Sequence, residues 1–137
     1  SSWIAQATDK SMLYVRKKPK GFGRNAQIEG DLGEGSQVLL VEDLATDGAS
    51  KVLFVNALRE AGAVVTDCFC VFYYGIFAGA LESLKKEGLT LHYLATWHDV
   101  LEAAEAGDYF PAETINGVKE FLEDPAAWSK AHGGKDA

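Results

Sequence analysis

The sequence has little cysteine, proline or methionine and no excess of basic residues. Its 137 residues include two cysteines, three prolines and one methionine, and the formal net charge is −7. The acidic balance argues against a general nucleic-acid-binding surface. Apolar runs stay well short of the ~20 residues that a membrane-spanning helix needs. We therefore expect a cytoplasmic protein without nucleic-acid or membrane partners.

The two cysteines, Cys68 and Cys70, lie two positions apart in one apolar segment. That spacing places both side chains on the same side of a strand. No second pair provides zinc-ligand spacing, so we expect buried free thiols in a reducing compartment. A Walker sequence and a Ser-His-Asp arrangement are also missing. Isolated histidines are expected to serve structure: His92 in core packing, His98 in capping and His132 in the tail.

Apolar segments and helical patterns alternate along the chain. Hydrophobic residues make up 47% and charged residues 24%, which is ordinary for a globular domain. We expect one domain, 1–137, of α/β class: a Rossmann-like parallel sheet flanked by helices. Residues 64–74 are almost continuously hydrophobic, which predicts a strand covered on both faces. The predicted strands are 12–15, 38–41, 64–74 and 89–96, with a short extended segment at 27–32. The predicted helices are 1–10, 50–61, 76–86, 98–106 and 113–122.

The stretch Gln37–Lys51 (QVLLVEDLATDGASK) combines a strand, two acids, a small loop and a helix start. A glycine-containing loop at a helix N-terminus offers backbone N–H groups to an anion. The acids Glu42 and Asp43 follow the apolar run and suit sugar hydroxyls or a metal ion. An ordinary turn with Ser50 as N-cap is a compatible alternative. The local chemistry predicts a ligand with a phosphate and a polyhydroxyl part.

A basic segment lies upstream of this stretch. Five of the thirteen lysines and arginines fall between positions 16 and 24, beside Pro19, Gly21 and Gly23. A solvated surface turn would explain the charge run alone. Next to a phosphate motif, it favours a local anion site on a flexible loop.

Together these two motifs resemble the type I phosphoribosyltransferases, and the basic segment, which closes at 27–30, resembles the mobile loop of the orotate phosphoribosyltransferases. The resemblance implies a type I phosphoribosyltransferase core that transfers phosphoribosyl from 5-phosphoribosyl 1-pyrophosphate (PRPP) to orotate. The products would be orotidine 5-monophosphate and pyrophosphate, in de novo pyrimidine biosynthesis. It also implies a homodimer in which loop 16–24 reaches the partner's active site. Mg²⁺ would be carried by PRPP near Glu42 and Asp43, without direct protein ligands.

The resemblance assigns roles residue by residue. It implies catalytic roles for Lys20, Asp43 and Asp47, and an orotate contact for Thr46. Asp47 is unusual beside a phosphate, and it could point away, meet Lys51 or transfer a proton. Phe22 stands where many relatives have a histidine and cannot donate a proton. The implied PRPP-binding residues are Arg16, Lys17, Lys20, Phe22, Glu42, Asp43, Leu44, Ala45, Thr46, Asp47, Gly48, Ala49 and Ser50.

Three other interpretations stay open from the residues. One is a PRPP-binding regulatory domain without turnover, and another is a phosphoribosyltransferase for a different base. A receiver-like domain with Glu42 and Asp43 as its acidic pocket is the third. The family extends further at its N-terminus, with a hood and a pyrophosphate loop, so the chain is expected to be incomplete relative to it.

Overall fold

A three-stranded parallel sheet forms the centre of the protein in a computed structural model that describes residues 1–17 and 27–134. Its strands are β3 (Gln37–Ala45), β4 (Val64–Tyr73) and β5 (Thr90–Thr96), in the order β3-β4-β5. Leu40 pairs with Cys68 and Cys68 with Leu91 across the sheet. The predicted α/β class with a parallel sheet is confirmed.

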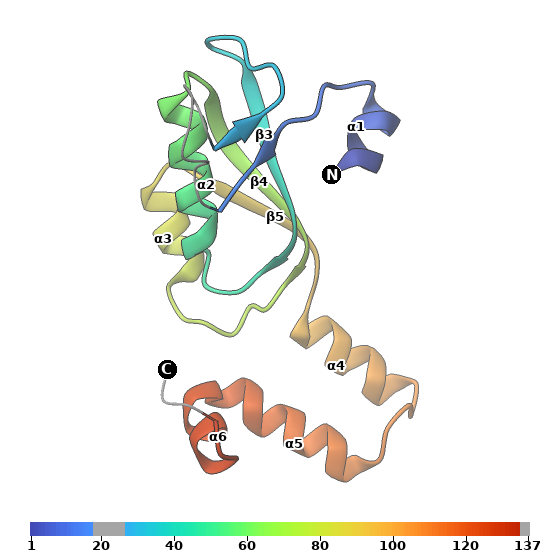
Figure 1. Ribbon diagram of the computed structural model, residues 1–137. Helices are drawn as coiled ribbons and strands as arrows, with labels where there is room; N and C mark the ends of the chain where they lie inside the picture. Colours follow the sequence, from blue (N-terminus) through green and yellow to red (C-terminus); the bar gives the residue numbers. More distant parts are fainter. Residues whose placement is uncertain (18–26, 135–137) are drawn as a thin grey trace.

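Helices α2 (Ala49–Glu60) and α3 (Ala80–Lys86) cover one face of the sheet (Figure 1). Their apolar sides meet the inward residues of β3 and β4 in the main core. Val55, Leu58 and Leu84 are almost completely buried there, and so are both cysteines. The prediction of buried free thiols is confirmed. This packing holds the start of α2 against the end of β3.

The opposite face of the sheet is exposed, contrary to the prediction for β4. Leu39, Val71 and Leu94 are 49%, 52% and 70% exposed, one on each strand. A hydrophobic run reports that both faces of a strand are apolar, but it does not report which element covers each face. His92 on β5 is also exposed and pairs with Asp67, so the expectation of a core histidine was wrong.

The N-terminal elements lie beside β3. Helix α1 (Ser2–Thr8) precedes a short antiparallel pair, β1 (Tyr14–Val15) with β2 (Ile28–Glu29). Figure 1 shows α1 on the side of the sheet away from α2. Gly35 then leads into β3, with its N–H bonded to the carbonyl of Gly62.

Three helices follow the sheet: α4 (Trp97–Ala106), α5 (Ala112–Glu123) and α6 (Pro125–Ala131). Thr96 and Asp99 form a capping box at the start of α4, so Thr96 rather than His98 caps this helix. An ion pair between Lys119 and Glu105 links α5 to α4. The three helices lie beyond the carboxyl end of the sheet (Figure 1). Within the described ranges, none of the helices is both long and apolar enough to cross a membrane.

Candidate functional site

The site begins with strand β3, which is longer than predicted. The strand continues past Val41 through Glu42, Asp43 and Leu44 to Ala45. The two acids are therefore inside the strand and not after it. Apolar residues alone were used to place the end of the strand, although the ladder to β4 continues through the acids and pairs Glu42 with Cys70. The loop between β3 and α2 shrinks to residues 46–48.

Adjacent residues of a strand point to opposite faces, and this separates the two acids. Glu42 is half-buried on the side of α2 and forms an ion pair with Lys51. Asp43 is exposed and has no hydrogen bond or ion pair to any residue that the structure describes. Asp43 is thus the acid that offers an exposed carboxylate.

The loop ends at a glycine that caps α2. Gly48 is buried at the N-cap of α2 with φ of 84°, in the left-handed region that glycine adopts without strain. Asp47, Ala49 and Ser50 are exposed around it, and Thr46 is half-buried. The helix begins at Ala49, so Ser50 lies within the first turn and is not the N-cap. The position of Gly48 explains this, because its backbone supplies the non-helical conformation that a cap requires.

Asp47 folds back onto the helix that it precedes. Its Oδ1 accepts a hydrogen bond of 3.0 Å from the backbone N–H of Ala49, and the Thr46 hydroxyl lies 3.5 Å away. Lys51 pairs with Glu42, so the suggested contact between Asp47 and Lys51 is absent. The carboxylate of Asp47 occupies one of the N–H groups that an anion would use.

Lys51 is the residue of this site that the sequence argument missed. It is 3% exposed, and its Nζ donates a hydrogen bond of 2.6 Å to the carbonyl of Leu44. Burial lowers the pKa of its ammonium group. A signal existed, because Lys51 precedes Phe54 and Val55 by three and four positions and so shares their buried helical face.

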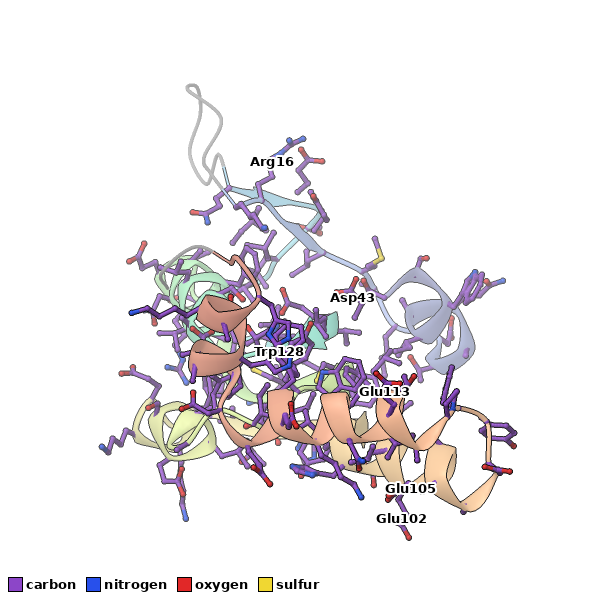
Figure 2. The ribbon with its side chains drawn as sticks, turned by 90° about the horizontal axis from the view of Figure 1, so that it is seen from below. Arg16, Asp43, Glu102, Glu105, Glu113 and Trp128 are labelled. Atoms are coloured by element: carbon purple, nitrogen blue, oxygen red, sulfur yellow. The ribbon has the colours of Figure 1, made fainter. Side chains whose placement is uncertain are left out.

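Arg16 lies on the short N-terminal ribbon, well apart from Asp43 (Figure 2). It is bonded to Glu29, with 2.6 Å between Nε and Oε1, and its backbone N–H bonds to the carbonyl of Gln27. Lys17 is exposed. Lys20 and Phe22 lie outside the described residues. The structure does not bring Arg16 to Asp43.

A groove of about 1140 Å³ is lined by residues from the basic segment and from β3, but neither Asp43 nor loop 46–48 lines it. It lies between β3 and the N-terminal segments α1 and β1. Arg16, Lys17 and Glu42 all line it, together with apolar residues such as Leu39 and Phe54. Among the residues that the structure describes, no group of three or more His, Cys, Asp or Glu could hold a metal ion. The groove therefore combines cations, the two carboxylates of Asp31 and Glu42, and an apolar wall.

Comparison with known proteins gives the site a context, although no family model matches the chain. An orotate phosphoribosyltransferase from Ruegeria sp. is 52% identical over 129 residues, which are 94% of this chain and 57% of that protein. The solved orotate phosphoribosyltransferase of Aeropyrum pernix superimposes with a TM-score of 0.66 at 34% identity, covering 77% of this chain and 58% of that one. The Mycobacterium tuberculosis orotate phosphoribosyltransferase in complex with PRPP superimposes with a TM-score of 0.53 at 31% identity, covering 64% of this chain and 48% of that one. The chain thus spans somewhat more than half the length of the curated relatives that it matches.

Proposed function

Because the chain belongs to the orotate phosphoribosyltransferase family, we propose that it binds PRPP and transfers its phosphoribosyl group to orotate in de novo pyrimidine biosynthesis. The observation that carries this proposal is the unit formed by β3, loop 46–48 and α2. It presents an exposed carboxylate beside a helix N-terminus whose cap is a left-handed glycine. That pairing suits a ligand made of a phosphate and a sugar.

Different residues of the site bind the phosphate, the ribose and the base of the ligands. Residues 45–50 bind the 5-phosphate through backbone N–H groups and the hydroxyls of Thr46 and Ser50. Asp43 accepts hydrogen bonds from the ribose hydroxyls, and Glu42 approaches the ribose from its place in the groove. Leu44 lies in the strand between Asp43 and the phosphate-binding residues 45–50. Thr46 also contacts orotate.

The cations of the N-terminal segment act on the leaving group. A nitrogen of orotate forms a bond to the anomeric carbon as the bond to pyrophosphate breaks, and pyrophosphate leaves with its electron pair. Arg16, Lys17 and Lys20 stabilise the charge that develops on it, because guanidinium and ammonium groups bind phosphate oxygens strongly. Phe22 adds an apolar contact. Positive charge on the ribose ring is stabilised by Asp43.

Asp47 is the third proposed catalytic residue. Its carboxylate is exposed at the mouth of the loop, one residue from Thr46, so it can exchange a proton with the base. Its bond to Ala49 must open when the 5-phosphate takes that N–H group. Binding of PRPP thus frees Asp47 for catalysis.

Magnesium fits this site as an ion brought by PRPP. Mg²⁺ keeps several waters and commonly takes one or two carboxylates together with substrate phosphates. The exposed carboxylate of Asp43 would accept hydrogen bonds from the waters of that ion without binding it directly, and Glu42 lies next to Asp43 in the sequence. When bound, the ion neutralises pyrophosphate charge. A homodimer in the cytoplasm, in which loop 16–24 of one subunit serves the other subunit's site, completes the proposal.

The test is PRPP-dependent consumption of orotate by this chain, with the Ruegeria relative as positive control. Asp43→Asn should reduce turnover strongly at unchanged stability, since the side chain is exposed. Asp108→Asn, at another exposed aspartate, is the matched control. Lys20→Ala should slow turnover much more than it weakens PRPP binding. Tight PRPP binding without any turnover would instead favour a regulatory PRPP-binding domain.

A further inference from the structure

Lys51 is placed where a lysine is normally unfavourable. It lies in the first turn of α2, near the positive end of the helix dipole, where cations are disfavoured. Lysine side chains are almost never fully buried unless they are paired, yet this one is 3% exposed. Neighbouring positions of the same helical face hold Phe54, Val55 and Leu58. A hydrophobic residue would suit both the burial of this position and the positive end of the helix dipole better than a lysine does.

The ammonium group of Lys51 has two partners on β3, and they flank Asp43. Nζ donates a hydrogen bond of 2.6 Å to the carbonyl of Leu44, and it forms an ion pair with Oε2 of Glu42. That oxygen is itself shielded from solvent. One buried cation therefore holds the residue before Asp43 and the residue after it.

The same contact spans the candidate anion loop. Glu42 and Leu44 lie on the strand before residues 46–48, and Lys51 lies on the helix after them. The side chain of Lys51 therefore links the two ends of the loop, whereas the backbone bonds of Lys51 and Val52 to the carbonyl of Gly48 lie within the start of the helix. Such a link restricts how far the strand end and the helix start can separate.

Packing alone does not explain a charged link here. A buried ion pair can often be replaced by hydrophobic residues of similar volume without loss of stability, because desolvation offsets much of the attraction. Residues that break local rules are expected at functional sites. The two bonds from Lys51 to β3 fix the direction and the distance between the end of the strand and the start of the helix, whereas an apolar side chain would fix neither.

We propose that Lys51 is a positioning residue: by tying Glu42 and the carbonyl of Leu44 to the first turn of α2, it fixes loop 46–48 and orients Asp43 toward the ligand. This inference rests on the proposed phosphoribosyl site. Lys51 itself contacts neither phosphate nor ribose.

The decisive comparison is Glu42→Gln against the double variant Glu42→Gln/Lys51→Met. Both lack the Glu42 carboxylate, so the pair differs in the ammonium group of Lys51 and in the hydrogen bonds that it donates, including the one to the carbonyl of Leu44. We expect the double variant to be at least as stable in urea, because an unpaired buried cation has been removed. We expect it to bind PRPP about tenfold more weakly, measured by calorimetry. PRPP affinity that simply follows stability would overturn the positioning role.

Amide hydrogen exchange of residues 46–50 without ligand separates this inference from the proposed function. Exchange should be faster in the double variant than in Glu42→Gln, and unchanged in Lys119→Met, which breaks the surface pair with Glu105. Equal exchange in the double variant and Glu42→Gln would overturn the link. If the unmodified chain failed to bind PRPP, the proposed function would fail while the exchange rates still decided the role of Lys51.

Discussion

Replacing Gly48 with alanine should destabilise the protein in two separable ways. Gly48 has φ of 84°, and a side chain in the left-handed region costs about 1–2 kcal/mol. A Cβ at this position would also lie 3.1 Å from three side-chain atoms of Leu84. Leu84 is 2% exposed, so it has little room to move. Overpacking of this kind adds roughly 1–2 kcal/mol.

Gly79 provides a matched control, because it is the N-cap of α3 with nearly the same backbone conformation, φ of 77°. A Cβ at Gly79 meets no atom within 4 Å. Gly79→Ala should therefore cost only the conformational strain. Urea unfolding measures the difference: with a slope m of roughly 2 kcal/mol/M, an extra 1–2 kcal/mol lowers the midpoint by about 0.5–1 M more in Gly48→Ala.

Two results would refute this reasoning. Equal midpoint shifts in the two variants would show that Leu84 yields without cost and that crowding is irrelevant. No shift in Gly79→Ala would show that the left-handed conformation carries no penalty in this fold. A change in m would mean that the denatured or native state had changed in compactness, and the comparison would then need hydrogen exchange.

Three further predictions follow from burial and ionisation. Leu58→Ala should cost ~2–5 kcal/mol in urea unfolding, because Leu58 is 1% exposed, whereas Leu94→Ala on the open face should cost far less. Burial raises the pKa of Cys68 to about 11, so a thiol reagent at pH 8 should label it only after unfolding; rapid labelling of the native protein would contradict this. Hydrogen bonds from Thr96 lower the pKa of Asp99, so the stability from this cap is full above about pH 4 and is lost as the pH falls through the lowered pKa. Asp99→Asn should weaken the loss of stability at acid pH, and an unchanged pH dependence of stability would exclude the cap as its source.

The repeating strand and helix units could be predicted because their signals are local. Helix 50–61 was observed as α2 (Ala49–Glu60), and strand 64–74 as β4 (Val64–Tyr73). Gly62 follows α2 with positive φ, as a residue beyond a helix end commonly does. Helix 76–86 was less accurate, since α3 begins only at Ala80 after a connection with Gly75 and Gly79. Two left-handed glycines outweighed the apolar pattern there.

Features that depend on tertiary packing were missed. The length of β3 is determined by its ladder to β4, which continues through Glu42 although the sequence there is no longer apolar. The open face of the sheet could not be predicted, since the hydrophobicity of a strand does not indicate which element covers it. Likewise, His92 in an apolar strand faces solvent and meets Asp67, because both project from the uncovered side.

The pairing of Glu42 with Lys51 shows where two local signals combine into a tertiary one. Strand alternation places Glu42 on the same side as Leu40, which packs in the core beneath α2. Helical spacing places Lys51 on the same side as Val55, which packs in that core as well. The loop between the elements has only three residues, so the first turn of α2 must lie against the end of β3. An acid and a base on those two facing sides have to meet, and the adjacent Asp43 is thereby left for the ligand.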